Sequence, residues 1–462
     1  EATLNEEDLL SQVISFYKEN SFKIDTDGEL KKIFLSLIKV KEKLTKLDKK
    51  VFNSIDIYNE IFKYLRKIGV DFKEKFVINS NLKKIPKSIN DTGNIDIKLN
   101  KLMSVLSKVS KKNIKEDSNL TVFKRSFYNR YEDKEVALVE ALDNELGIGY
   151  LPHLKDEVIF SDLIDDVTMP QVRKITSERK VEIKVHNFWL NLLLQNPEKK
   201  EINLAKEDLT IFKEENEAKN GAFSISYSYT KDKIYLKHVG GTTGTNLIGR
   251  FSNSDTDVQE IINNVTGFEK SLLKNKIVAE VIHLPNNRAG NILIRKVNRD
   301  AEISIISKAS GNTKVIDVND LYISLKRNRI VLRSKKENKE VVPFLSSAQN
   351  YHYNSLPIYH FLCDLQSQDR HNDYSINFGG FNIGDLEYCP RLTYGEDVIL
   401  RKATWLLKKD NYKGIENLKA DLIKKSVPRY IYITSGGEDK MIIDIENYNT
   451  LNILYQEIEK NK

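Results

Sequence analysis

The first seventy residues carry apolar side chains at the three- and four-residue spacing of amphipathic helices. Three helices are predicted, over residues 9–17, 30–47 and 57–68, and Asn5 is placed to cap the first of them. Gly69 follows the third as a natural helix end. We interpret these helices as ordinary packing elements.

The spacing then changes to alternation over residues 94–99, where three apolar side chains alternate with Asp96 and Lys98. This pattern predicts a half-buried strand. Helical spacing returns over residues 102–109 and 120–131. The chain therefore reads as helix, strand and helix in this region.

From residue 222 onward, short runs of β-branched and aromatic residues predict strands. They lie at residues 223–229, 234–239, 278–284, 303–306, 321–325 and 330–332. Residues 326–329 are predicted to form a hairpin turn. Further helices are expected at residues 257–273, 357–365 and 448–458. The polar stretches 195–201 and 366–373 are predicted to be linkers.

Strands and helices follow one another without a regular βαβ order, which predicts an α+β fold with mixed sheets and packed helices. At 462 residues the chain exceeds one ordinary core, so two or three subdomains are expected. We predict a mixed helical and strand subdomain over residues 1–115. The main core is predicted over residues 116–462, with an internal boundary near residues 195–220.

Composition changes this picture little. The 73 basic and 66 acidic residues give a net charge of +7, which is compatible with a polyanionic partner but does not establish one. Cys363 and Cys389 lie in no CxxC or metal-ligand spacing, and two scattered thiols suit a reducing cytoplasm. The seven histidines show no spacing such as HExxH, so no metal is expected. No apolar run reaches the ~18 residues that span a bilayer.

The stretch from Gly240 to Phe251 holds the most suggestive local chemistry. It reads GGTTGTNLIGRF, so three glycines within five residues allow a tight turn and close approach to a ligand. Arg250 follows in an apolar setting, where an always-charged fork is costly unless it meets an anion. The stretch lacks the Gly-Lys-Ser/Thr ending of a nucleotide P-loop and the spacing of GxGxxG. Taken alone, the stretch favours a plain turn after a strand.

Six further segments occur in order along the chain. They read FKRSFYNRYEDKEVALVEALDNELGIGY (123–150), IVAEVIHLPNNRAGN (277–291), DLYISLKRNRIVLRS (320–334), EVVPFLSSAQNYHYNSLPIYHFLCDL (340–365), YCPRLTYGEDVILRKATW (388–405) and SVPRYIYITSGGEDKMIIDIEN (426–447). The series resembles the N-terminal, glutamylating portion of class I lantibiotic dehydratases, the family of the nisin dehydratase. The resemblance covers residues 90–462, and the first ninety residues fit only by position.

The resemblance implies a specific reaction. Glutamyl-tRNA would donate glutamate to Ser and Thr hydroxyls of a precursor peptide, and a separate elimination domain would then expel glutamate to leave dehydroamino acids. Because the tRNA ester supplies the activation, no cofactor is implied beyond glutamyl-tRNA as co-substrate. The implied partners are a precursor peptide with its leader, an elimination domain or protein, a lanthionine cyclase and a transporter. A homodimer and a cytoplasmic location, peripheral to the membrane through partners, are also compatible with the family.

The resemblance also suggests site residues. Arg250 matches the arginine of a family motif, and Asp96 aligns with a family aspartate; both are implied to be catalytic. Arg250 would clamp a carboxylate or phosphate, and Asp96 would orient the hydroxyl or hold a basic residue in place. A purely structural role remains open for each of them.

Substrate-binding residues are expected in two places. His283, Arg288 and Asn291 lie on a predicted strand-turn-strand that would present polar groups at a pocket rim. Asn246 lies within the glycine-rich stretch. The alternative for the first group is a plain turn at PNN.

Two other functions remain open. One is a peptide aminoacyl-tRNA ligase, which adds an amino acid to a peptide C-terminus, and the other is a non-catalytic scaffold that binds peptide or tRNA. A serine or cysteine hydrolase is disfavoured because no GxSxG or Cys-His signature is present. The chain opens at Glu1 without methionine, and the family's preceding basic region and following elimination domain are not recognisable. We therefore expect an internal fragment of the module that is inactive alone.

Overall fold

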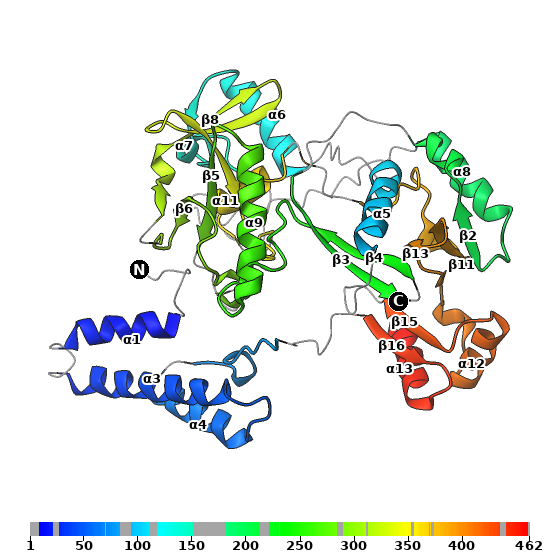
Figure 1. The fold of residues 1–462 in the computed structure, drawn as a ribbon, viewed down its shortest axis with the longest axis horizontal. Helices are drawn as coiled ribbons and strands as arrows, with labels where there is room; N and C mark the ends of the chain where they lie inside the picture. The colour runs from blue at the N-terminus through cyan, green and yellow to red at the C-terminus, as the bar shows by residue number, and fades with distance from the viewer. Residues whose placement is uncertain are drawn as a thin grey trace, which may run out of the picture.

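The computed structural model describes most of the chain. The described residues are 9–21, 27–69, 71–83, 94–110, 118–151, 182–212, 221–230, 232–283, 290–310, 313–352, 355–368, 370, 374–434 and 440–460. Within them the chain is an α+β protein with several sheets, as predicted (Figure 1). Asn5, the predicted helix cap, lies outside the described residues.

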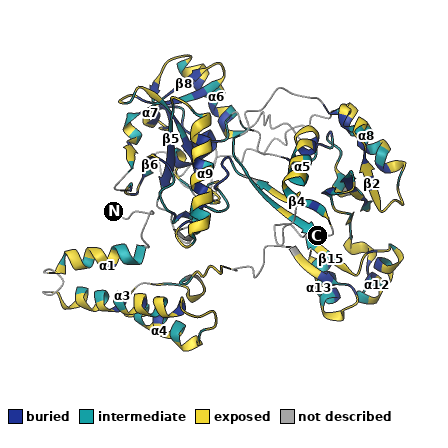
Figure 2. Ribbon diagram, viewed as in Figure 1, coloured by how far each residue is buried: buried dark blue, intermediate teal, exposed yellow. Residues whose placement is uncertain are grey.

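The three predicted N-terminal helices are confirmed. They are α1 (Leu9–Glu19), α3 (Gly28–Leu47) and α4 (Ile55–Arg66). Helix α3 begins where the Asp27 side chain accepts hydrogen bonds from two backbone N–H groups of the first turn. Val40, Leu47 and Ile61 form the small core between these helices, whose outer faces are largely exposed (Figure 2).

A seven-stranded mixed sheet forms the largest core. Its order is β1 (Val136–Ala137), β8 (Leu321–Lys326), β9 (Arg329–Ser334), β10 (Lys339–Phe344), β5 (Ile277–His283), β6 (Ala301–Ile305) and β7 (Lys314–Ile316). The last four strands run parallel, whereas the first four are antiparallel. The predicted hairpin joins β8 to β9, with Arg327 and Asn328 both at positive φ, which suits the strand twist.

Helices surround this sheet. They are α6 (Asn119–Tyr131), α7 (Leu138–Ala141), α9 (Thr256–Leu272), the short α10 (Gly290–Leu293) and α11 (Pro357–Leu365). Phe123 and Phe127 of α6 and Phe361 of α11 pack into the same buried cluster as the strands. Burial is concentrated on β5 and its neighbours, because these strands are covered on both sides (Figure 2).

A second sheet has five strands. Its order is β2 (Glu201–Leu204), β12 (Arg391–Tyr394), β13 (Val398–Arg401), β4 (Lys233–Gly240) and β3 (Ser224–Thr230). Helices α5 (Ile95–Val109) and α8 (Ile183–Leu194) pack against it, with Trp189 completely buried. A two-stranded pair, β11 (Tyr388–Cys389) and β14 (Thr404–Trp405), lies beside this sheet.

The C-terminal part builds its own small core. The hairpin β15 (Tyr430–Thr434) and β16 (Lys440–Asp444) packs with α12 (Ile415–Lys424) and α13 (Tyr448–Lys460). Cys363 and Cys389, which belong to the two larger cores, are both free and buried. Among the described residues, no helix combines the length and apolarity needed to cross a bilayer.

The strand predicted over residues 94–99 is wrong, because these residues form the first turns of α5. The apolar positions continue at helical spacing through Leu102, Leu106 and Val109, all buried, whereas Ile97 is 65% exposed. The short alternation was therefore a chance feature of one helix face. Helix α5 also packs with residues of the 185–400 region, and the domain boundaries near residues 115 and 195–220 stay predictions.

Candidate functional site

The glycine-rich stretch forms a compact turn directly after β4. We call residues 240–251 the glycine turn. Gly241 has φ +90°, which favours glycine, and residues Gly249–Phe251 form one turn of 3₁₀ helix. Arg250 is half-buried there, with its guanidinium carbon 4.6 Å from the centre of the Phe251 ring. Within the described residues, Arg250 forms no ion pair with a carboxylate.

The glycine turn lies against the segment that follows β10. A Cβ atom placed on Gly249 would lie 2.0 Å from the carbonyl oxygen of Ser346, so only glycine fits here. On the next residues, the Ser252 hydroxyl accepts a 2.9 Å hydrogen bond from the Lys296 N–H. The turn is thus fixed from two sides by backbone groups.

Glu280, in the middle of β5, organises the charged groups beneath the turn. Its Oε1 accepts hydrogen bonds from Arg295 Nη2 at 2.6 Å and from the Ser346 N–H at 2.7 Å. Its Oε2 accepts from the Ser346 hydroxyl at 2.8 Å and from Arg299 Nε at 3.2 Å. All four residues are buried. Donors of this number offset the cost of removing a carboxylate from water.

Glu269 of α9 extends the network to the glycine turn itself. Its Oε2 lies 2.6 Å from Arg299 Nη2, and its Oε1 accepts a 3.2 Å hydrogen bond from the Gly244 N–H. Arg299 Nη2 also lies 3.3 Å from the Thr243 hydroxyl. Helix α9, strand β5 and the turn therefore share one buried network.

A third arginine brings an excess of positive charge. Arg370 donates a hydrogen bond to the Thr242 carbonyl oxygen, and its guanidinium lies 4.6 Å from the Phe344 ring centre, over which Arg299 also lies at 4.1 Å. Burial lowers the pKa of Arg370, because desolvation disfavours the charged form. Among the described residues, the guanidinium groups of Arg295, Arg299 and Arg370 thus face only two carboxylates, those of Glu269 and Glu280. A bound anion here would offset the cost of burying the guanidinium that lacks a carboxylate partner.

Several polar atoms around the turn are buried without a hydrogen-bond partner among the described residues. They are Thr242 Oγ1, Asn246 Oδ1, Arg299 Nη1 and Ser347 Oγ. Buried polar atoms of this kind are rare unless a ligand or water completes their hydrogen bonds. Guanidinium and hydroxyl donors suit the oxygens of a carboxylate or phosphate. The arrangement is that of an anion-binding site.

The structure describes three of the four predicted substrate-binding residues, and two of these lie in the glycine turn or beside it. Asn246 belongs to the glycine turn. His283 ends β5, stacks on Tyr359 with ring centres 4.7 Å apart, and has a pKa lowered by burial. Asn291 lies in α10, which contacts the 3₁₀ turn of Arg250. The side chain of Asn291, and Arg288 as a whole, lie outside the description. The strand predicted after this turn is wrong, since α10 takes its place.

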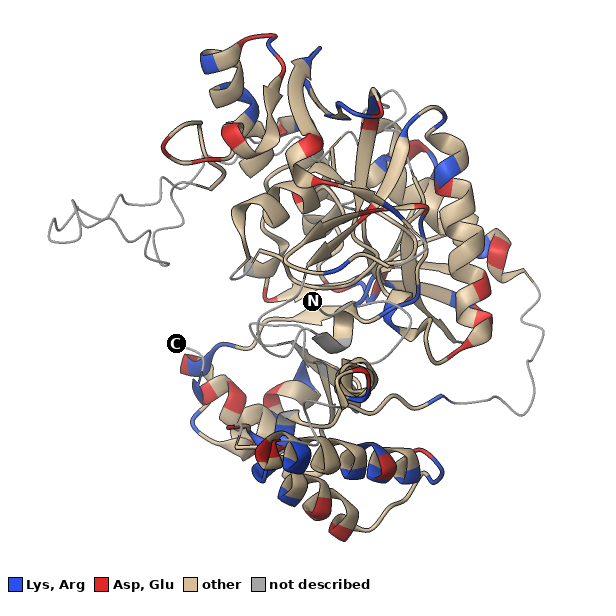
Figure 3. Cartoon of the chain, turned by 90° about the vertical axis from the view of Figure 1, so that its left-hand side faces the viewer, with Lys and Arg blue, Asp and Glu red and all other residues tan. Residues whose placement is uncertain are grey.

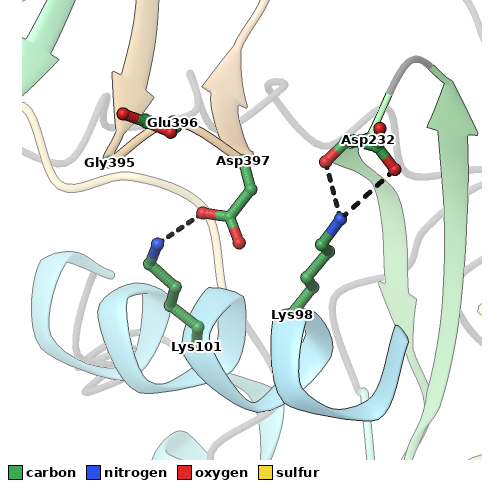
Figure 4. Close-up of a pocket in the computed structure, with 6 residues that line it drawn as sticks. All are labelled: Lys98, Lys101, Asp232, Gly395, Glu396 and Asp397. Atoms are coloured by element: carbon green, nitrogen blue, oxygen red, sulfur yellow. Dashed lines mark hydrogen bonds and ion pairs between the residues drawn. The ribbon is translucent and has the colours of Figure 1, made fainter. Parts of the chain in front are cut away.

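Asp96 lies elsewhere. It is exposed in the first turn of α5, two residues before Lys98, whose ammonium contacts Asp232 at the start of β4 (Figure 4). The glycine turn follows the opposite end of β4. At ~3.3 Å per residue, the eight-residue strand separates the two places by roughly 25 Å. The structure therefore does not bring Asp96 and Arg250 together.

An open groove of about 590 Å³ is lined by Lys98, Lys101, Asp232, Gly395, Glu396 and Asp397 (Figure 4). Lys101 is paired with Asp397, and Lys98 donates to the Asp232 carbonyl oxygen at 2.9 Å. Both lysines of the groove are thus already paired with aspartates. The groove lacks a surplus of cationic groups such as that formed by the three arginines beside the glycine turn.

Little in the sequence indicated the buried network. One signal was present, because Glu280 is a single charged residue inside the apolar strand IVAEVIH. A buried carboxylate needs a charged partner, so an arginine near this strand could have been expected. The partners Glu269, Arg299 and Arg370 are far apart in the sequence, and only the fold brings them together.

Comparison with known proteins fits this architecture. The family model described as lantibiotic dehydratase, N terminus, matches residues 2–454. The subtilin biosynthesis protein SpaB of Bacillus subtilis is 23% identical over 401 residues, which cover 81% of this chain and 37% of SpaB. The epidermin biosynthesis protein EpiB of Staphylococcus epidermidis is 26% identical over 206 residues, or 40% of this chain and 20% of EpiB. The chain thus spans less than half the length of these relatives.

Solved structures share the fold. The tRNA-dependent lantibiotic dehydratase MibB from Microbispora sp. 107891 matches 99% of this chain and 45% of its own, with a TM-score of 0.75 and 15% identity. The glutamylation domain TbtB from thiomuracin biosynthesis matches 95% of this chain and 54% of its own, with a TM-score of 0.56 and 14% identity. Since the family model covers nearly the whole chain, the protein belongs to the lantibiotic dehydratase family and corresponds to its N-terminal region.

Proposed function

We propose that the glycine turn, together with Arg299 and Arg370 beside it, binds the glutamyl end of glutamyl-tRNA and that the protein transfers glutamate to Ser and Thr hydroxyls of a ribosomal precursor peptide. A separate elimination step then leaves dehydroamino acids. One structural relative is described as tRNA-dependent and another as a glutamylation domain, which supports this assignment.

The observation that carries the proposal is the buried, arginine-rich site with donors that lack a partner among the described residues. Arg299 Nη1 and the Ser347 hydroxyl are buried and have no acceptor among the described residues. Acyl transfer needs fixed donors where negative charge develops on the ester oxygen, and donors in a water-excluded site are most effective. An anion that enters also neutralises the surplus guanidinium charge.

The roles of the predicted residues follow from their positions. Arg250 is proposed to clamp the glutamate carboxylate or the terminal phosphate of the tRNA, and Asn246 to contact the same group. His283, Arg288 and Asn291 are proposed to line the approach to it. Asp96, roughly a strand length away, is proposed to act on another part of the substrate, so its substitution should raise KM more than it lowers kcat.

Nucleic-acid binding would use a different surface. Helix α3 carries six lysines and two glutamates, and Lys and Arg are dense on the helices at the foot of Figure 3. Phosphate contacts make affinity fall steeply with salt. Glutamyl-tRNA binding that stays constant between low and physiological salt would contradict tRNA as the co-substrate.

The proposed partners are the precursor peptide with its leader, the elimination domain or protein, a lanthionine cyclase and a transporter. No cofactor is proposed beyond the aminoacyl-tRNA. The protein is proposed to work in the cytoplasm, peripheral to the membrane through its partners, and a homodimer is compatible with this arrangement.

The test is transfer itself. The gene product that contains this chain is incubated with glutamyl-tRNA and precursor peptide, and peptide masses are followed. We expect glutamyl adducts on Ser and Thr, strongly reduced in Arg370→Lys and unchanged in Arg391→Lys, whose side chain is 44% exposed. An adduct at the peptide C-terminus would indicate a ligase instead. Binding of peptide and tRNA without any adduct would indicate a scaffold.

A further inference from the structure

Two histidines and an aspartate meet beside α11. His360 and Asp364 lie one helical turn apart on α11, and His352 comes from the turn that precedes the helix. His360 Nε2 lies 3.1 Å from His352 Nδ1 and 3.4 Å from Asp364 Oδ2. The spacing of an imidazole and a carboxylate at i and i+4 on one helix was a signal available in the sequence.

Two of these distances match those between neighbouring ligands of one metal ion. A tetrahedral Zn²⁺ ion with ligands at 2.0–2.1 Å requires ligand atoms about 3.3 Å apart. One imidazole nitrogen here faces two other ligand atoms at 3.1 and 3.4 Å, and all three ligand atoms lie within 4.8 Å of one another. A simple hydrogen bond would explain one of the two short approaches, whereas a shared cation explains both.

The surroundings fix the ligands as metal sites do. The Tyr150 hydroxyl donates a 2.5 Å hydrogen bond to Asp364 Oδ2, and Tyr150 is almost fully buried. Ligating carboxylates are commonly oriented by such a donor. The Tyr150 and Tyr351 rings pack edge-on against His360 and restrict its rotation.

We propose that His352, His360 and Asp364 bind one divalent transition-metal ion, Zn²⁺ first, in a site with a coordination position open to solvent. His352 is exposed, so an ion can enter from the surface. Imidazole and carboxylate ligands suit Zn²⁺ and Co²⁺ rather than Ca²⁺ or Mg²⁺. The ion would tie the turn before α11 to the helix and, through Tyr150, to the segment after α7. This site is independent of the function proposed for the glycine turn.

The test uses the protein stripped of metal with a chelator and titrated with Co²⁺, then with Zn²⁺. We expect one equivalent of Co²⁺ with a visible d–d spectrum, displaced by Zn²⁺, and a rise in Tm on binding. Asp364→Asn and His352→Ala should abolish the spectrum; His352 is exposed, so its loss leaves the fold intact. Tyr150→Phe should weaken affinity about 10–100-fold, as loss of a ligand-orienting group does.

The matched control is His238→Ala, which removes an exposed histidine from β4 and should bind metal as the unaltered protein does. Absence of stoichiometric Co²⁺ and Zn²⁺ binding would overturn the proposal and leave a plain hydrogen bond between His352 and His360. Binding that survives both His352→Ala and Asp364→Asn would overturn it as well, because the ion would then lie elsewhere.

Discussion

Arg299 Nη2 lies 2.6 Å from Glu269 Oε2, and the two side chains are 2% and 1% exposed. This pair joins the loop before β6 to helix α9, and the other oxygen of Glu269 holds the Gly244 N–H of the glycine turn. The shape of the turn therefore depends on a carboxylate more than twenty residues away.

Replacing Glu269 by alanine should destabilise the protein strongly. The change leaves a buried guanidinium with half of its carboxylate partners, and removing one partner of such a pair costs about 3–5 kcal/mol. Chemical unfolding and hydrogen exchange of β5 and the glycine turn measure the effect. Glu42→Ala, which breaks the half-exposed pair with Lys39, is the control and should leave both unchanged. Equal behaviour of the two variants would contradict the structural importance of the buried network.

Gly249→Ala should displace the glycine turn, because the new methyl group would lie 2.0 Å from a backbone carbonyl oxygen that cannot move alone. We expect lower stability and weaker glutamyl-tRNA binding. Gly267→Ala, in the middle of α9 with open space around it, should instead stabilise the protein by up to ~1 kcal/mol through helix propensity. Melting curves of both variants, with tRNA-binding assays, check the contrast.

Arg250→Lys should lose most glutamyl transfer while the fold survives. A lysine ammonium cannot reproduce the planar, two-pronged donor set, and losing one donor at a developing charge typically costs about 10²–10³ in rate. Peptide mass gain is measured beside a melting curve, with Arg391→Lys as the control. Full activity of Arg250→Lys would show that Arg250 does not take part in transfer. Loss of activity together with loss of the folding transition would indicate that Arg250 is structural.

His283 should give the protein a pH-dependent stability. Burial lowers its folded-state pKa below the ordinary value of 6.5, so the unfolded chain binds more protons just below that pH. The contribution of His283 is therefore complete above about pH 6.5 and is lost as the pH falls toward the folded-state pKa.

The variant His283→Phe keeps a ring against Tyr359 and should flatten this pH dependence. Unfolding is measured from pH 7.5 down to about pH 5. His238→Phe, on the exposed side of β4, is expected to retain the slope of the unaltered protein. An unchanged slope in His283→Phe would show that another group causes it.

The fold was largely predictable where periodicity was long. Helices such as α11 and the hairpin between β8 and β9 follow directly from apolar spacing and turn residues. The failure at α5 has a physical cause: six residues of alternation were outweighed by the buried helical stripe that continues through Leu102 and Val109. A short window cannot distinguish the two periods.

The site was predictable only around Arg250. The polar stretch 366–373, predicted to be a linker, instead contributes Gln366, whose side chain accepts a hydrogen bond from the Leu345 N–H, and Arg370, which binds the Thr242 carbonyl oxygen. Polar composition indicates exposure on average, but it cannot reveal that a distant backbone segment supplies the partners. Pairings at long range along the chain are set by the fold.

The β3–β4 hairpin has a consequence for how the protein responds to a ligand. Strand β4 is paired with β13 in the five-stranded sheet, whereas the residues that follow it are seated on Ser346 and Glu269 beside the seven-stranded sheet. An anion that fixes the glycine turn therefore also restrains the end of β4. Because such coupling is reciprocal, a change in the packing of the five-stranded sheet alters affinity at the turn without touching the ligand, and occupancy of the turn in return restrains β4 within the five-stranded sheet.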